Sequence, residues 1–432
     1  MINEKETNGN KSKLKSALGA VDKIKISGIG LVAYIVMAIL LIVAISTHKL
    51  PNTMIGAILA LVIMGHVFYY IGAHLPIFRS YLGGGSVFTI LVMAVLVYLN
   101  IVPSDTVKTA SGFINGMDFL GLYIVSLIGS SIFKMNRKML LSAAVRFLPV
   151  AFLSMAVTFF GVGLVGMLIG VGFSHAVLYT SLPIMAGGVG AGIVPLSGIY
   201  AHAFGSSAAV ILGNLLAIIS AGLVSKLFLH SKSNGHGVLL KTENADAQVV
   251  ADPKPDYTQI GVGLIISVSF FVFGTLLSAL FPSINAYAFI ILSIVLTKAL
   301  GLLPEYYEQS VIMSGQVITK NMTHALLAGV GMSLVNIKLL LSALSWQFVV
   351  LCLTSIIVIS LASYFLGKLF GLYPVESVIT AGLANNSMGG TGNVAVLAAS
   401  DRLNLIAFAQ MGNRIGGALV LVIAGILVSF MH

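Results

Sequence analysis

Long apolar segments dominate this chain and constrain its fold more than any other feature. Stretches of about twenty apolar residues recur from residue 28 to residue 431, and only 8% of the 432 residues are charged. A helix of about twenty residues spans the ~30 Å hydrocarbon core of a bilayer, whereas soluble domains carry roughly 25% charged residues. The apolar residues do not alternate with a period of two, which argues against a β-barrel. The sequence therefore predicts an all-α multi-pass membrane protein in the lipid bilayer.

Eleven apolar segments are long enough to span a membrane, and two further segments are interrupted by glycine. The predicted spans are 28–47, 52–72, 86–103, 118–133, 147–172, 206–229, 258–280, 285–303, 318–336, 346–371 and 403–431. The interrupted segments are 174–203 and 373–401. The predicted domain plan is a cytoplasmic tail at 1–27, an extra helix at 28–51, a first repeat at 52–229, a linker at 230–257 and a second repeat at 258–432.

Basic residues flank the predicted spans and indicate their orientation. The formal net charge is +10, but charges beside spans fit the positive-inside rule better than a nucleic-acid partner. With a cytoplasmic N-terminus, only Lys49, Lys108 and Lys338 fall outside among the basic residues between spans, and the C-terminal His432 is extracellular. Glycine, proline and mixed charge in the linker 230–257 predict a solvated hinge on the cytoplasmic side.

The two halves of the chain carry three landmarks in the same order. The run KMLLSA from Lys138 resembles KLLLSA from Lys338, a GGxG motif follows each run, and a Gly-Asn pair ends at Asn214 or Asn413. The basic loop predicted at 134–146 is cytoplasmic, whereas Lys338 is outside, so the repeats are inverted. Each repeat has five spans and one interrupted segment. Inverted repeats are typical of secondary transporters, whose substrate site lies near the midplane between broken helices.

The interrupted segments are predicted to be re-entrant hairpins that enter from opposite sides of the membrane. Irregular backbone at membrane depth is tolerated only inside protein or beside a wet cavity, and helix ends present N–H groups that bind anions. The alternative is close helix packing through small residues. The candidate substrate-binding residues at the two tips are Gly187, Gly188, Gly190, Asn386, Ser387, Gly389, Gly390 and Gly392.

Arg414 lies in an otherwise uncharged span and is the main candidate for binding an anion. It is roughly 18 Å beyond Arg402 at helical rise, so it belongs near mid-membrane. No aspartate or glutamate occurs in the apolar part of a span, and an arginine fork suits bidentate contact with a carboxylate. The alternative is a structural arginine held by hairpin carbonyls. The neighbouring Asn413 and its repeat partner Asn214 either support the tips or contact substrate.

Other polar residues indicate packing rather than chemistry. His66 and His324 are lone histidines on apolar helices, Lys298 is near enough to a span end to snorkel, and Cys352 reads as a small buried hydrophobe. The sequence contains no metal-ligand cluster, nucleotide-binding motif or Ser-His-Asp arrangement. We therefore expect no metal, no cofactor and no enzymatic activity.

At the two GGxG motifs and at Asn413-Arg414-Ile415-Gly416-Gly417 the chain resembles the 2-hydroxycarboxylate transporter family. The resemblance runs from about Lys23 to Met431 and is strongest toward the citrate permeases of lactic acid bacteria. It implies eleven spans, two re-entrant hairpins, a homodimer and an elevator-like movement of a substrate domain. It also implies that Arg414 binds the carboxylate of a 2-hydroxy acid.

The resemblance implies exchange of external citrate or malate for internal lactate. Divalent citrate entering against monovalent lactate would carry one net negative charge inward, worth about 2.3 kcal/mol at 100 mV. The alternatives are a sodium- or proton-coupled malate or citrate symporter, or an anion channel or sensor on this scaffold. Two departures stand out: Met388 replaces an arginine of the sodium-citrate branch, and the connection from Tyr200 to Gly213 is short.

Overall fold

The structure, a computed structural model, describes residues 25–26, 28–81, 84–135, 137–187, 196, 207–241, 255–281, 286–387 and 389–429. Several sequence predictions lie outside these residues. They concern Gly188, Gly190, the tail before residue 25, the start of the connection after Tyr200, and the linker from 242 to 254.

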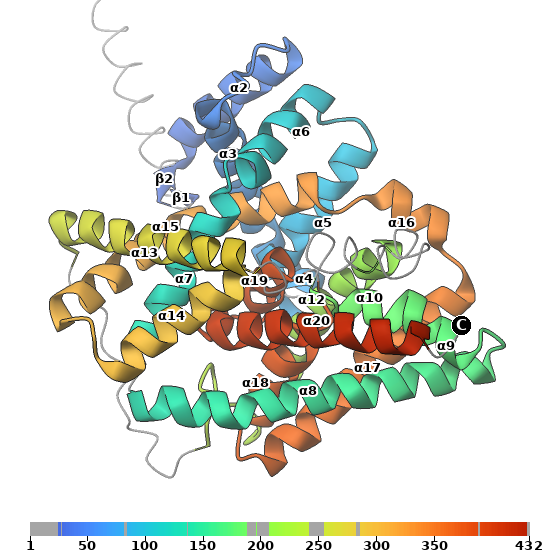
Figure 1. The fold of residues 1–432 in the computed structure, drawn as a ribbon. Helices are drawn as coiled ribbons and strands as arrows, with labels where there is room; N and C mark the ends of the chain where they lie inside the picture. Colours follow the sequence, from blue (N-terminus) through green and yellow to red (C-terminus); the bar gives the residue numbers. More distant parts are fainter. Residues whose placement is uncertain are drawn as a thin grey trace, which may run out of the picture.

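The described chain is almost entirely helical (Figure 1). The longer helices of the first half are α2 (Leu31–Ser46), α3 (Met54–His74), α5 (Gly84–Tyr98), α7 (Phe119–Phe133), α8 (Arg137–Leu168) and α12 (Ser207–Leu227). Those of the second half are α13 (Tyr257–Leu280), α14 (Ala286–Leu300), α15 (Glu305–Ser333), α17 (Trp346–Leu369) and α20 (Ile406–Ser429). Shorter helical pieces are α4 (Pro76–Tyr81), α6 (Ser104–Ser111), η1 (Gly112–Gly116), α9 (Phe173–Ala176), η2 (Val177–Ser181), α10 (Leu182–Met185), α16 (Ile337–Ala343), α18 (Pro374–Ser377), η5 (Val378–Leu383), α19 (Gly390–Ala399) and η6 (Leu403–Leu405).

Two short strands precede the first long helix. β1 (Lys25–Ile26) pairs antiparallel with β2 (Ile29–Gly30), and Gly28 between them has a positive φ of 86°. Ile26 is buried and packs in one apolar cluster with Tyr34 of α2 and Ile63 of α3. Lys25 and Ile26, which the sequence placed in the tail 1–27, therefore belong to a strand pair.

Two helices begin earlier than the predicted spans. α8 starts at Arg137, where a basic loop was predicted as far as residue 146, and α15 starts at Glu305 rather than at 318. Lysine, arginine, leucine and alanine are good helix formers, so a basic run continues the helix readily. In α15, Glu305 and Glu308 lie in the first turn, where acidic side chains stabilise the positive helix end. The loop prediction was wrong because it equated charge with irregular backbone.

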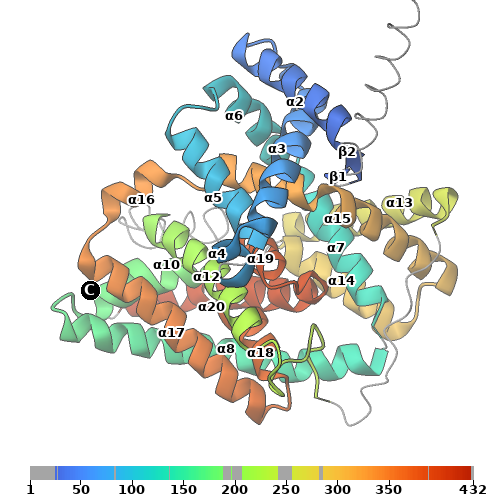
Figure 2. The same ribbon diagram turned by 180° about the vertical axis from the view of Figure 1, so that it is seen from behind.

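The helices form two packed groups that each draw on both halves of the chain (Figures 1 and 2). In the first helix group, α3, α5 and α7 pack against α15, and α13 packs against α7, α14 and α15. In the second helix group, α8 packs against α17 and α20, and α12 packs against α17 and α19. The two halves are interleaved, so neither folds as a separate domain.

Part of the predicted linker is built into the second helix group. Asn234, Leu239 and Leu240 are buried, and Leu240 forms an isolated antiparallel β-bridge with Leu372. Lys232, His236, Val238 and Lys241 are exposed, so the prediction of a solvated hinge is wrong only for the buried positions of residues 231–241. Their polar and glycine content was read as exposure, whereas these groups meet hydrogen-bond partners in the fold.

Several helices expose apolar side chains on the outside of the molecule. Among the residues that the structure describes, four helical stretches are each long and apolar enough to cross a membrane: Met54–His74, Leu140–Leu168, Tyr257–Leu280 and Trp346–Leu369. The pair Ser104–Gly116 and Phe119–Phe133, bent by 45°, would add a fifth span. On α13, Ile265 is 69% exposed and Leu276 is 61% exposed, which is unfavourable in water but not in hydrocarbon. The structure thus supports a helical membrane protein, and the count of eleven spans stays a prediction.

Candidate functional site

The second glycine motif lies where a chain of short helices breaks. The second broken segment, defined here as residues 374–399, consists of α18, the π-helix η5, a turn and α19. Pro374 starts α18 in the first turn, where a missing N–H is harmless. Gly389 has φ 75° and ψ −132°, a conformation that side chains disfavour, and it precedes the first residue of α19. We call residues 384–393 the second tip.

The first broken segment is described from Phe173 to Gly187 and ends beside the second tip. Its pieces α9, η2 and α10 are followed by Gly187, whose φ is 88°. A Cβ atom placed on Gly389 would collide with the carbonyl oxygen of Gly187. The two glycine motifs, far apart in the sequence, therefore meet backbone to backbone at the residues that the structure describes.

One helix from each half closes on this junction. Asn214 of α12 and Asn413 of α20 are both buried. The Asn214 side-chain oxygen occupies the space that a side chain at Gly392 would need. The Asn413 amide donates a hydrogen bond to the carbonyl oxygen of Ala384, at 3.2 Å. The structure brings both asparagines to the second tip, and their relation by an internal repeat stays a prediction.

Four buried asparagines at the second tip each have one side-chain amide atom without a hydrogen-bond partner among the described residues. Asn385 donates to the carbonyl of Ala381 (2.8 Å), and Ser355 of α17 donates to the side-chain oxygen of Asn386 (2.7 Å). The hydroxyl of Ser387 donates to the side-chain oxygen of Asn393, at 2.8 Å. These bonds fix the amide planes. The remaining amide atoms have no hydrogen-bond partner among the described residues: Asn385 Oδ1, Asn386 Nδ2, Asn393 Nδ2 and Asn413 Oδ1.

Burying an amide atom without a hydrogen-bond partner costs free energy. A bound ligand that supplies the missing partners would offset this cost. Leaving such a group without a partner costs about 1–3 kcal/mol. The free Nδ2 groups are donors that suit a carboxylate, and the free Oδ1 atoms are acceptors that suit a hydroxyl group. A small molecule with both groups side by side matches this set. Asn385 and Asn393 were not among the predicted site residues, although both flank the motif that was.

The structure gathers most of the predicted site residues at one place. Asn386, Ser387, Gly389 and Asn413 are buried there, and Gly390 and Gly392 form the first turn of α19, whose N–H groups have no partner earlier in that helix. Arg414 follows Asn413 in α20, and its side chain lies outside the described part of the structure.

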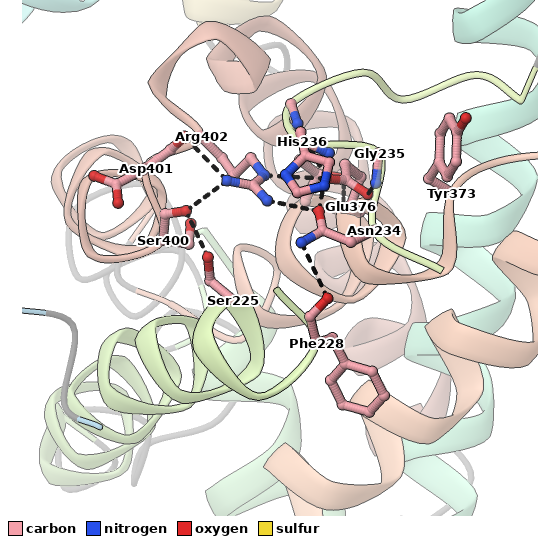
Figure 3. A network of polar contacts seen from close by, with 12 residues as sticks. Ser225, Phe228, Asn234, Gly235, His236, Tyr373, Glu376, Ser400, Asp401 and Arg402 are labelled. Atoms are coloured by element: carbon pink, nitrogen blue, oxygen red, sulfur yellow. Dashed lines mark hydrogen bonds and ion pairs between the residues drawn. The ribbon is translucent and has the colours of Figure 1, made fainter. Parts of the chain in front are cut away.

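A buried ion pair joins the two ends of the second broken segment (Figure 3). Glu376 of α18 is fully buried, Arg402 just beyond α19 is 5% exposed, and Arg402 Nε lies 3.0 Å from Glu376 Oε1. The sequence interpretation missed this pair, because it placed Arg402 among cytoplasmic charges and did not consider Glu376. Only the return of the chain brings the two residues together.

A polar cavity of about 420 Å³ lies between the first helix group and the end of the second broken segment. His324 lines it, stacks on Tyr69 with ring centroids 3.7 Å apart, and lies 5.2 Å from the His66 ring. The remaining lining residues are Ser86, Thr319, Lys320, Thr323, Ala398, Asp401, Leu403 and Asn404. His324 therefore faces a polar space rather than only packing among apolar neighbours.

A second buried ion pair lies away from both glycine motifs. Lys298 of α14 is 7% exposed, and its Nζ lies 2.7 Å from Glu308 Oε2 and 3.0 Å from the carbonyl oxygen of Phe133. The prediction that Lys298 snorkels was wrong, because α15 begins early enough to supply Glu308. Among the described residues, no group of three or more His, Cys, Asp or Glu side chains is arranged to hold a metal ion.

Comparison with known proteins gives consistent matches over nearly the whole chain. Residues 26–426 match the sequence model of the 2-hydroxycarboxylate transporter family. The citrate transporter CitP of Lactococcus lactis subsp. lactis is 73% identical over 427 residues, which cover 97% of each chain. The malate transporter MleP of the same subspecies is 49% identical, covering 94% of this chain and 98% of its own. The Na(+)-malate symporter of Bacillus subtilis is 34% identical, covering 94% of this chain and 93% of its own.

Proposed function

The chain belongs to the 2-hydroxycarboxylate transporter family, and from this premise we propose that it exchanges external citrate for internal lactate across the cell membrane. The chain is a secondary transporter of 2-hydroxycarboxylates. The observation that carries the choice of citrate is the 73% identity to a citrate transporter along nearly the full length of both chains. The family and these relatives are transporters, and we propose no catalytic activity for this chain.

The second tip supplies the binding chemistry that such a substrate needs. All 2-hydroxycarboxylates carry a carboxylate beside a hydroxyl group. In the proposed site, Arg414 and the Nδ2 groups of Asn386 and Asn393 donate hydrogen bonds to the carboxylate. The Oδ1 atoms of Asn385 and Asn413 accept from the 2-hydroxyl group. Recognition of the hydroxyl strengthens specificity, since an analogue without it leaves buried acceptors unpaired.

The proposed architecture has eleven spans, two inverted five-helix repeats and two re-entrant hairpins, with the N-terminus cytoplasmic and the C-terminus extracellular. The contact of Gly187 with Gly389 supports tips that meet inside the protein. The ion pair between Glu376 and Arg402 supports a re-entrant second segment, because it holds the two ends of that segment together. We further propose a homodimer in which the second helix group moves past the first, as in an elevator.

The polar cavity is proposed to be part of the substrate route. It lies between the two helix groups and combines Lys320 and His324 of α15 with Asp401 and Asn404 near the start of α20. A wet passage at the boundary between a moving and a static body is where a polar substrate would leave.

A cation-coupled symporter is the second candidate function. It is favoured by the Na(+)-malate symporter of Bacillus subtilis, which is 34% identical to this chain. An anion channel or sensor has less support, because the relatives named above are transporters.

Counterflow in proteoliposomes separates these functions. Citrate uptake is measured with lactate inside, without lactate inside, and with a sodium or proton gradient. We expect uptake to require internal lactate and to generate a membrane potential, negative inside. Uptake that follows a sodium gradient and ignores internal lactate would favour the symporter, whereas uptake that needs neither would favour a channel.

A further inference from the structure

We propose that Glu376 and Arg402 are positioning residues for transport, which lock the linker loop 231–241 and the end of α12 to the base of the second broken segment. The locked parts then move as a single body during exchange. This inference rests on the proposed transport function. It assigns the linker to the substrate-carrying body rather than to a hinge between two halves.

The carboxylate of Glu376 is held by groups from two separate stretches of chain. Arg402 Nε donates to its Oε1 (3.0 Å), and the backbone N–H groups of Gly235 and Gly237 donate to Oε2 (2.7 Å) and Oε1 (3.1 Å) (Figure 3). A fully buried carboxylate is stable only when charge and hydrogen bonds compensate its lost hydration. If the linker loop detached from α18, Glu376 would lose two backbone N–H donors that compensate its burial. We therefore expect the loop to stay attached.

The guanidinium of Arg402 completes the connection to α12. Its Nη2 donates to Asn234 Oδ1 (2.8 Å), and its Nη1 donates to the carbonyl oxygen of Ser400 (2.9 Å). Asn234 Nδ2 in turn donates to the carbonyl of Phe228, just after α12 (3.1 Å). The hydroxyl of Ser225, in α12, donates to the same Ser400 carbonyl at 3.0 Å.

Backbone contacts extend this attachment along the linker loop. Tyr373 N–H donates to the carbonyl of Leu239 (2.8 Å), and Lys241 N–H donates to the carbonyl of Gly371 (3.0 Å). These two bonds flank the antiparallel bridge between Leu240 and Leu372, which are 3% and 0% exposed. The loop thus adds a short, buried ladder beside the entry to α18.

The locked elements carry all residues of the proposed substrate site that come from the second half of the chain. They also carry Asn214, which comes from the first half. α12 bears Asn214, the second broken segment bears the tip, and α20, which follows Arg402, bears Asn413 and Arg414. Arg402 lies between α19 and α20, so its position influences the orientation of both helices relative to the base. A shift at the base is therefore transmitted to the tip through two helices, and we expect it to alter substrate affinity.

A cross-link tests whether the linker and the segment move together. Cysteines replace Leu240 and Leu372 in a Cys352→Ala background. Opposed residues of an antiparallel pair have Cα atoms about 4.5–5.5 Å apart, within the roughly 4.4–6.8 Å range of disulfides. We expect oxidised and reduced proteins to exchange citrate for lactate at rates within about twofold, since a disulfide here only fixes a contact already buried. Loss of exchange on oxidation, restored by dithiothreitol, would overturn the proposal. Citrate–lactate exchange by the reduced protein tests the proposed function separately from the proposed movement as a single body.

A pair of matched carboxamide variants tests positioning. Glu376→Gln is compared with Glu308→Gln, which removes the charge from the other buried ion pair. We expect Glu376→Gln to raise the KM for citrate about tenfold, because small misplacements of binding groups are costly. Glu308→Gln should leave KM within about twofold. Arg402→Lys should raise KM about as much as Glu376→Gln, because a single ammonium cannot reach the three partners that Nε, Nη1 and Nη2 contact. An unchanged KM in Glu376→Gln, or equal losses of inserted protein in both carboxamides with no KM change, would reduce the pair to a structural role.

Discussion

The tip and the base of the second broken segment treat buried polar groups in opposite ways. At the base, Glu376 and Arg402 are charged, and each is held by several hydrogen bonds. At the tip, Asn386 and Asn393 are uncharged, and one amide atom of each has no partner among the described residues. Saturated groups stabilise a position, whereas unsaturated groups are free to bind. The comparison supports the two proposals that the base positions the tip and that the tip binds the substrate.

The largest expected effect is at Arg414. Arg414→Ala should lower citrate exchange at least about 30-fold, because truncating one partner of a desolvated charge pair costs about 2–5 kcal/mol. Insertion into the membrane should be unchanged. The measurement is lactate-driven citrate uptake in proteoliposomes, normalised to inserted protein. Normal uptake by this variant would contradict the proposal that the substrate carboxylate binds at the second tip.

A smaller effect is expected where the two glycine motifs meet. A methyl group at Gly389 would collide with the carbonyl of Gly187 and would also occupy a positive φ of 75°. Gly389→Ala should reduce exchange about tenfold or more, because both backbones must shift. Gly170→Ala is the control, since its φ is 79° but no atom lies within 4 Å of the added carbon. Equal losses in both variants would attribute the effect to backbone strain alone.

The smallest expected effect at the tip comes from one amide. Asn393→Leu removes the free donor, and the Ser387 hydroxyl keeps its other acceptor, the carbonyl of Ala384 at 2.6 Å. The KM for citrate should rise about three- to tenfold, whereas the melting temperature should stay equal or increase because an unsatisfied group is lost. Asn321→Leu, an exposed amide on α15, is the control. A lower melting temperature with unchanged KM would make Asn393 structural.

Local sequence patterns predicted where most of the long helices lie. Contacts between distant residues were less predictable. The apolar runs predicted α3 and α17 within a few residues, because span length and hydropathy are properties of one segment. The irregular backbone at Gly389 also followed from the glycine motif. The burial of Arg402 and of the linker loop did not, since both depend on partners that only the folded chain brings near. Helix starts at Arg137 and Glu305 were missed because charge alone does not end a helix.

Citrate binding to purified protein, measured by isothermal titration calorimetry, tests the central claim most directly. The samples are the wild type, the tip variant Arg414→Ala and the base variant Arg402→Lys. We predict that Arg414→Ala loses at least about 30-fold in affinity, as expected for a truncated buried charge pair, whereas Arg402→Lys loses only about tenfold because it acts through the position of the tip. Equal affinities for Arg414→Ala and the wild type, or a loss confined to Arg402→Lys, would contradict the assignment of the substrate to the tip.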